Sequence, residues 1–172
     1  MASRILPALI LALWAVAAGA GEVTIAMRTE GESGRFRFEP RLVWIEPGET
    51  VSFVADSHIH GTSTITGMIP TGARPWRSVM GRPLTVRLER PGVYGFKCPA
   101  HYALGMVGLI VVGDPRANLE AARRVRHPPA AQRAFARLFA LIDCTLAGQG
   151  RCPAPRATVA YSGGFRKAHE GK

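Results

Sequence analysis

The stretch VYGFKCPAHYALGMVGLIVV, residues 93–112, carries both a fold signal and a chemical signal. It begins and ends with runs rich in Val, Ile, Phe and Tyr, which are typical of β-strands. The loop between these runs holds Cys98, His101 and Met106 in the pattern Cys-x2-His-x4-Met. One loop between neighbouring strands can bring three such side chains to one end of a β-sandwich. Thiolate, imidazole and thioether are soft ligands, so their convergence predicts a metal site that suits few metals.

The region around this stretch predicts a mainly β fold. Short segments rich in Val, Ile, Phe and Thr recur from residue 22 to residue 113, and they include EVTIAM, RFRFEP, RLVWIEPGETVSFVA and LTVRLERPGVYGFK. The Pro-Gly pairs in EPGE and RPGV mark turns between them. Many short strands at regular spacing are typical of an antiparallel sandwich or barrel.

The pattern changes after residue 113. DPRANLEAARRV, residues 114–125, has the Asp and Pro of a helix start, and PPAAQRAFARLFALID, residues 128–143, repeats apolar residues at helical spacing. We therefore expect two C-terminal α-helices, the second packed on the sandwich. Residues 144–172 are rich in Gly, Pro, Ala and Arg, which predicts a largely disordered tail with a possible disulfide between Cys144 and Cys152.

A fourth metal ligand must come from outside this loop. The segment ADSHIHGTSTI offers His58 and His60 just after an expected strand. Two histidines, one cysteine and a weak axial methionine form the ligand set of blue-copper electron-transfer sites. Taken singly, a buried Met, an exported Cys or a lone His is more often structural than ligating, but their combination on one loop favours a metal. Zinc is the alternative metal, and Met is a poor ligand for it.

The sequence resembles pseudoazurin, a periplasmic cupredoxin of bacteria, in FEPRLVWIEPGETVSFV, GMIPTGA, PGVYGFKCPAHYALGMVGLIVVGD and NLEA. The resemblance runs from about residue 22 to residue 142 and implies a Greek-key sandwich. It also implies one type 1 copper ion, alternating between Cu(I) and Cu(II), on His60, Cys98, His101 and Met106. In the family, the first ligand His precedes the Met of GMIP by the spacing that His60 has here. His58 is then expected to be a neighbour facing solvent.

Two positions depart from the family pattern near the site. The family usually has Asn directly after the first ligand His, where its side chain ties the two ligand loops together, and this chain has Gly61. The family commonly has Pro directly before the second ligand His, and this chain has Ala100. Because Ala100 has a backbone N–H that Pro lacks, we hypothesise that this N–H donates to the Cys98 sulfur and raises the reduction potential.

The first 20 residues predict export. MASR is a basic start, an apolar run follows, and AGA at residues 18–20 is a small-residue cleavage site. We therefore expect residues 1–20 to be a cleaved signal peptide, residues 21–143 to be the cupredoxin domain, and the mature protein to lie in the periplasm with no membrane span. The formal net charge of +10 favours acidic partners, and the scattered basic residues do not predict nucleic-acid binding.

These features predict a soluble, monomeric one-electron carrier and not an enzyme. The expected partners are periplasmic redox proteins with acidic docking surfaces, such as nitrite reductase, nitrous oxide reductase, cytochrome c or a dehydrogenase. We expect the edge of His101 to pass the electron within an apolar patch of the same loop, with basic residues around it: Arg74, Arg77, Arg82 and Lys97. The alternative function is copper delivery or storage, although the methionines are too dispersed to favour it.

Overall fold

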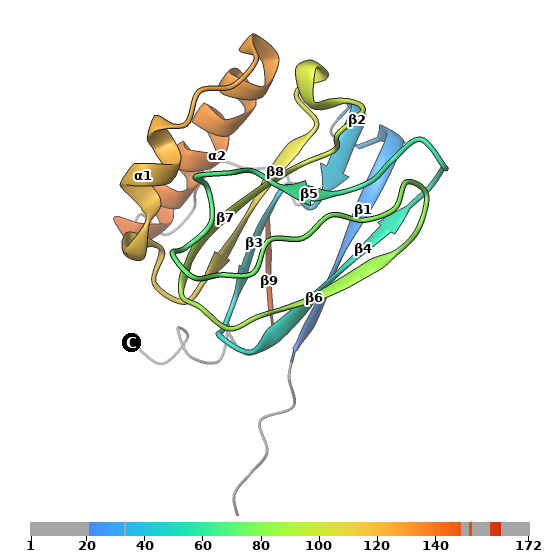
Figure 1. Cartoon of the computed structure of the whole chain (residues 1–172). Helices are drawn as coiled ribbons and strands as arrows, with labels where there is room; N and C mark the ends of the chain where they lie inside the picture. The colour runs from blue at the N-terminus through green and yellow to red at the C-terminus, as the bar shows by residue number, and fades with distance from the viewer. Residues whose placement is uncertain (1–20, 33, 149–151, 153–158, 163–172) are drawn as a thin grey trace, which may run out of the picture.

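Two β-sheets pack face to face in the computed structural model, which describes residues 21–32, 34–148, 152 and 159–162. The first sheet has the strand order β2-β1-β4-β6, and the second has the order β5-β7-β8-β3-β9 (Figure 1). The strands of the first sheet are β1 (Glu22–Gly31), β2 (Gly34–Glu39), β4 (Glu49–Ala55) and β6 (Leu84–Leu88). Those of the second are β3 (Leu42–Ile45), β5 (Ser63–Thr64), β7 (Gly92–Lys97), β8 (Val107–Val112) and β9 (Val159–Tyr161).

The second sheet is buried on both faces. Every residue of β8 is buried, and its side chains alternate between two hydrophobic clusters. Leu109 and Val111 belong to the cluster that includes the helices, whereas Ile110 and Val112 belong to the cluster between the sheets. This alternation is the two-residue period of a strand, and it explains why β8 reads as a continuous apolar run.

Two α-helices cover the outer face of the second sheet (Figure 1). They are α1 (Leu119–Arg124) and α2 (Pro129–Leu146), and a 3-10 turn, η2 (Pro115–Ala117), precedes them. The predicted helical face of α2 is confirmed, because four of its large apolar residues, at helical spacing, are buried against the sheet: Phe135, Leu138, Phe139 and Ile142. A second 3-10 turn, η1 (Tyr102–Leu104), lies in the loop between β7 and β8.

The sandwich is confirmed, but its sheets are not purely antiparallel. β1 pairs with β4 in parallel, and β3 pairs in parallel with both β8 and β9. The EPGE turn carries the chain from β3 in the second sheet to β4 in the first, so these consecutive strands do not pair with each other. Turn signals show where strands end, but they do not show which strands become neighbours across the sandwich.

The tail contributes a strand that the sequence analysis did not anticipate. Residues 159–161 form β9 at the edge of the second sheet, and the N–H of Ser162 donates to the carbonyl of Trp44 at 2.8 Å. The predicted disulfide between Cys144 and Cys152 is formed, which leaves Cys98 as a free, buried cysteine. The predicted signal peptide lies outside the described residues. No helix in the described ranges is long and apolar enough to cross a membrane.

Candidate metal centre

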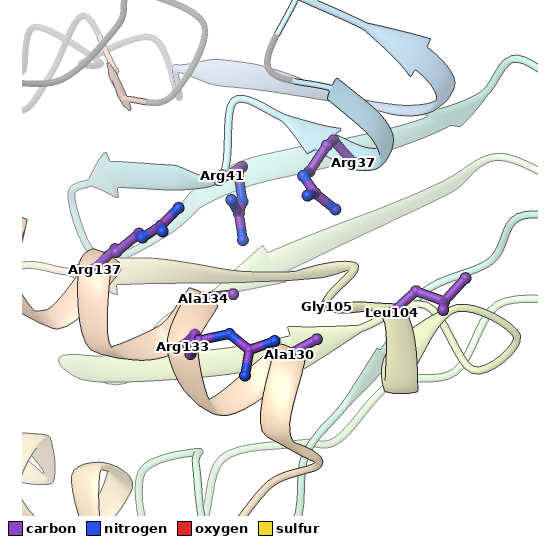
Figure 2. A pocket seen from close by; sticks show the side chains of 8 residues that line it. All are labelled: Arg37, Arg41, Leu104, Gly105, Ala130, Arg133, Ala134 and Arg137. Carbon is purple, nitrogen blue, oxygen red and sulfur yellow. The ribbon is translucent and has the colours of Figure 1, made fainter.

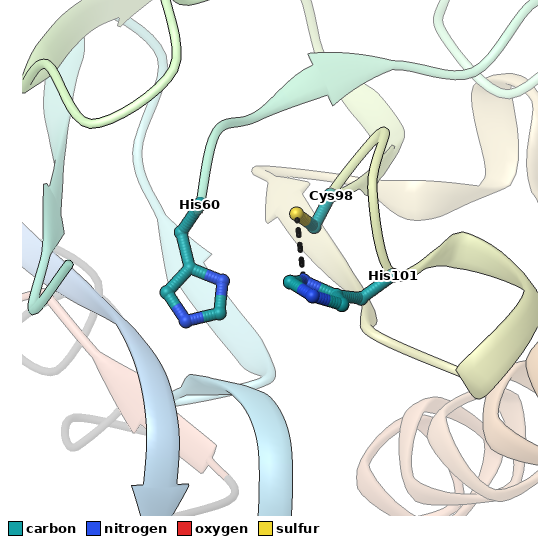
Figure 3. A group of neighbouring side chains, drawn as sticks. All are labelled: His60, Cys98 and His101. Atoms are coloured by element: carbon teal, nitrogen blue, oxygen red, sulfur yellow. Dashed lines mark hydrogen bonds between the residues drawn. The ribbon is translucent and has the colours of Figure 1, made fainter. Parts of the chain in front are cut away.

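Three predicted ligands converge at one end of the sandwich. His60 lies between β4 and β5, Cys98 directly follows β7, and His101 directly precedes η1. One ligand atom from each of these residues lies within 4.8 Å of the others. Figure 3 shows the three side chains facing a common point. His58 is exposed, whereas His60 is fully buried, so the choice between the two histidines agrees with the structure.

Contacts of the His60 ring leave one of its nitrogens free for a metal. Nε2 lies 2.9 Å from Thr29 Oγ1 and 3.5 Å from Asp56 Oδ1. Asp56 is itself held by the N–H of Thr29, which donates to Oδ2 at 2.9 Å. Nδ1 is buried and has no hydrogen-bond partner among the described residues. A proton on Nε2 is therefore favoured, and it leaves the lone pair of Nδ1 directed into the cluster.

The donor set fits a type 1 copper ion. A buried polar atom without a partner is costly, so the unpartnered Nδ1 of His60 indicates a ligand that the protein alone does not supply. Sγ of Cys98, fully buried, lies 3.5 Å from Nδ1 of His101. The His60 and His101 rings have their centroids 5.0 Å apart. Two imidazoles and one thiolate around a single point match the trigonal ligand set of blue-copper sites.

Burial favours the neutral form of both histidines. It lowers the pKa of His60, and the nearby His101 lowers it further, although Asp56 acts in the opposite direction. Burial also lowers the pKa of His101. Since a metal binds only the unprotonated ring nitrogen, both shifts favour metal binding at neutral pH.

Met106 lies beside the cluster. It is fully buried in the cluster of side chains between the sheets that also contains Cys98. Its carbonyl accepts from the N–H of Cys98 at 3.0 Å, and its N–H donates to the carbonyl of His101 at 3.2 Å. These two bonds close the loop into a compact turn, so the backbone of Met106 is fixed relative to Cys98 and His101.

Phe36 of β2 covers the site from the other sheet. Its ring stacks on the His101 ring, with centroids 4.2 Å apart and planes 11° apart, and its edge approaches the His60 ring. Phe36 has a φ of 50°, which is unusual for a residue with a bulky side chain. The stacked ring shields part of the imidazole from water.

Several contacts hold the loop that contains His60. The N–H of Gly81 donates to the carbonyl of His60 at 2.7 Å, and the N–H of Thr62 donates to Ser78 Oγ at 2.9 Å. A Cβ atom on Gly61 would lie 2.7 Å from Met80 Sδ, so a side chain there would require the flexible Met80 side chain to move. β5 then pairs with β7, which connects the His60 loop to the strand that leads to Cys98.

The hypothesis about Ala100 is not supported. Among the described residues, its N–H makes no hydrogen bond to the Cys98 sulfur; the contact recorded for Sγ is the one with His101.

Comparison with known proteins identifies the family. The model of the copper binding proteins of the plastocyanin/azurin family matches residues 25–113, more than half of the chain. The pseudoazurin of Methylorubrum extorquens is 43% identical over 126 residues, which cover 73% of this chain and 85% of that protein. The chain belongs to the pseudoazurin family. The pseudoazurin of Paracoccus pantotrophus is 38% identical over 108 residues, with 63% of this chain and 74% of that protein covered.

Solved pseudoazurins share the fold. The crystal structure of the pseudoazurin from Methylobacterium extorquens AM1 matches with a TM-score of 0.68 and 43% identity, covering 70% of this chain and 98% of that one. The pseudoazurin from Hyphomicrobium denitrificans matches with a TM-score of 0.66 and 29% identity, covering 69% of this chain and 96% of that one. The resemblance that the sequence motifs indicated is confirmed.

Sequence reasoning found the three clustered ligands but missed the residues that hold them. Thr29, Phe36 and Asp56 lie on or next to β1, β2 and β4, far in sequence from the metal loop. Their residue types and spacing carry no metal signal. Only the pairing of β1 with both β2 and β4 brings them to the same end of the sandwich.

Proposed function

We propose that the protein is a one-electron carrier and not an enzyme, with copper held by His60, Cys98, His101 and Met106. The observation that carries this proposal is the buried, prearranged cluster, in which Cys98 and His60 are fully buried and only His101 is partly exposed. When bound, copper supplies a one-electron redox couple to such a site. Three protein ligands and a weak axial thioether form the ligand set of blue-copper electron-transfer sites, which supports an electron carrier.

The strands and turns around the site fix the positions of its ligand residues. β5 pairs with β7, β7 pairs with β8, and the loop between β7 and β8 is closed by the backbone bonds of Met106. Ligands fixed in this way change little in position when the charge of the site changes, so the energy of reorganisation is small. We assign Met106 the role of weak axial ligand because its sulfur is soft and its side chain is buried beside Cys98.

An exposed apolar patch around the site supports docking of a redox partner. Four exposed apolar side chains belong to the segments that surround the two histidines: Ile59, Val79 and Met80 near His60, and Leu104 after His101. Leu104 lies in η1, directly after His101, and is 54% exposed. A small apolar contact with charged surroundings is typical of transient electron-transfer complexes. We infer a periplasmic redox protein with an acidic rim as the partner, because the net charge of the chain is +10.

The export of the protein is part of this proposal. The sequence of residues 1–20 supports a cleaved signal peptide, and the disulfide between Cys144 and Cys152 fits an oxidising compartment such as the periplasm. The domain boundaries expected from the sequence follow from it, with residues 21–143 as the cupredoxin domain and residues 144–172 as an appended tail. The N-terminal sequence of the protein recovered from the periplasm tests the cleavage after Ala20.

Visible absorption of the Cu(II)-loaded protein tests the function. An intense blue or blue-green band that disappears on reduction, and is absent in Cys98→Ser, would support a thiolate–copper electron carrier. The Met106→Ala variant should keep the band with an altered position, since the axial ligand tunes the site without carrying the charge transfer. A colourless loaded protein would exclude this function and favour copper delivery or storage.

A further inference from the structure

A cavity of about 280 Å³ beside the metal-ligand loop is lined by four arginines. We call it the arginine pocket, and its arginines are Arg37, Arg41, Arg133 and Arg137. Leu104 and Gly105 of the loop between β7 and β8 also line it, so it directly adjoins the segment that carries His101 and Met106.

The four arginines come from two distant parts of the chain. Arg37 lies in β2 and Arg41 directly precedes β3, whereas Arg133 and Arg137 are one turn apart on the exposed side of α2. Figure 2 shows Arg37 and Arg41 extending toward α2. Their spacing in the sequence carries no signal, since the packing of α2 on the second sheet creates the pocket.

No carboxylate neutralises this cluster within the described part of the chain. Elsewhere arginines do pair with acidic residues: Arg35 with Glu30, Arg87 with Glu89, Arg116 with Asp114, and Arg123 with Asp143. None of the four pocket arginines forms such a pair among the described residues.

Several donors of the pocket are also buried without a partner. They are Nε of Arg37 and both Nε and Nη2 of Arg41. A buried donor of a charged group that finds no acceptor costs more than an ordinary lost hydrogen bond. The arrangement is therefore unfavourable unless an acceptor enters the pocket.

Burial and the neighbouring positive charges both affect the pKa of Arg41. Burial, together with the charges of Arg37 and Arg137, lowers the pKa of Arg41 from its usual value to about 10. The Arg41 guanidinium still carries its charge at neutral pH. A bound anion would offset both the repulsion and the loss of water around Arg41.

We propose that the arginine pocket binds a phosphate group. Planar guanidinium forks match the oxygens of phosphate in bidentate geometry, and a doubly charged group offsets more of the four charges than a single carboxylate does. The small residues Gly105, Ala130 and Ala134 in the lining leave space for it. The group is inorganic phosphate or the phosphate of a larger molecule such as a lipid headgroup. This inference does not rest on the proposed electron-carrier function.

Calorimetric titration of the full-length mature protein tests the site, with sodium phosphate as the probe and sodium acetate at equal ionic strength as the reference. We expect phosphate to bind more tightly than acetate. The variant Arg133→Gln/Arg137→Gln should weaken phosphate binding by about tenfold for each arginine removed. Both positions are exposed on α2, so the fold should persist, which thermal unfolding checks.

A matched control separates the pocket from general charge. Arg82→Gln/Arg87→Gln removes the same charge at two exposed positions outside the pocket and should leave phosphate affinity within about twofold of the unchanged protein. Equal loss in both double variants, or equal binding of phosphate and acetate, would overturn the proposal. The proposal would also be overturned if the protein bound neither phosphate nor, through the arginine pocket, vesicles.

Vesicles that contain phosphatidylglycerol distinguish the two sources of the group. Binding of inorganic phosphate without vesicle binding assigns the site to free phosphate. Vesicle binding that is lost in the pocket variant and kept in the control assigns it to a lipid headgroup. Either result supports a phosphate site, and the copper spectrum of each variant reports independently on the electron-carrier function.

Discussion

The Phe36 ring lies flat on the His101 ring, with 4.2 Å between the centroids and 11° between the planes. This contact joins β2 of the first sheet to the metal loop that follows β7 of the second. His101 is the ligand with partial exposure, so Phe36 controls how much water reaches it. The shell around a metal site sets its solvent access and thereby its reduction potential.

Replacing Phe36 by Ala should lower the reduction potential of the copper site. The Cu(II) site carries one more positive charge than the Cu(I) site, and water admitted beside His101 stabilises the more charged state. We expect a decrease on the order of tens of millivolts, where 59 mV corresponds to a tenfold change for one electron. Cyclic voltammetry measures it, and an unchanged or higher potential would refute this role.

Phe36→Gly separates the ring from the backbone at the same position. Both variants remove the ring, but Gly adopts the observed φ of 50° without strain. Phe36→Gly should therefore be more stable than Phe36→Ala by about 1 kcal/mol. Urea unfolding of the two metal-free variants measures the difference, and equal stabilities would mean that the backbone carries no strain there.

Replacing Thr29 by Val should weaken copper binding. Val has the shape of Thr but lacks the hydroxyl that lies 2.9 Å from Nε2 of His60. The imidazole ring of His60 is therefore held less firmly in the orientation that binds copper. Loss of such a supporting contact costs about 10–100-fold in metal affinity. Competition with a chelator measures the affinity. Thr85→Val removes a strand hydroxyl that contacts Ser52 instead and should leave the affinity unchanged.

Unchanged copper affinity in both Thr29→Val and Asp56→Asn would contradict this prediction. These residues are the recorded partners of His60 Nε2, so no other described contact would fix the ring through that atom.

Adding a methyl group at Gly61 should destabilise the protein, and shortening Met80 should relieve the effect. A Cβ on Gly61 would lie 2.7 Å from Met80 Sδ and 3.1 Å from Ser78 Oγ. Because Met80 is flexible and partly exposed, we expect a cost at the lower end of the about 1–3 kcal/mol that overpacking brings. Met80 is partly exposed, so Met80→Ala alone should cost little. A double-mutant cycle by urea unfolding should give a favourable coupling energy, and strict additivity would argue against the clash.

Acidification should destabilise the metal-free protein in part through His127. Burial, and then the charge of Lys97, lower the pKa of His127 below its usual value of 6.5. The unfolded chain therefore binds the proton more readily, so this part of the stability is present above about pH 6.5 and is lost as the pH falls toward the lower folded pKa. His127 Nδ1 also lies 2.5 Å from the Tyr102 hydroxyl, which cannot donate to a protonated Nδ1.

Urea unfolding of the metal-free protein at pH 7.5 and pH 5.5 measures this dependence. His127→Gln should reduce the loss of stability between these pH values. The part of the loss that comes from His60 and His101, whose pKa values are also lowered, should remain. An equal loss in the variant and the unchanged protein would exclude a contribution from His127.

Replacing Tyr161 by Ala should destabilise the edge of the second sheet. The Tyr161 ring stacks on Trp44, with centroids 6.4 Å apart and planes 21° apart, and β9 pairs in parallel with β3. The loss should be about 1 kcal/mol. Urea unfolding measures it against Leu146→Ala, which truncates an exposed side chain at the end of α2 and should have little effect. An unchanged midpoint in Tyr161→Ala would mean that β9 adds no stability.

The ligand pattern and the class of the fold could be predicted from the sequence alone. The spacing of Cys98, His101 and Met106 placed them on one loop between two strands, and the alternative between His58 and His60 was resolved by the family pattern. These features are local in the chain, because a strand, a turn or a short ligand loop is specified by adjacent residues.

The surroundings of the copper ligands became visible only in the folded structure. The stack of Phe36 on His101, the contact between Thr29 and His60, the strand β9 and the arginine pocket all join residues that are distant in sequence. Their formation depends on which strands become neighbours and on where α2 packs, and these choices follow from burying the apolar faces together. The identity of a single residue does not predict which distant residue it will contact in the folded protein.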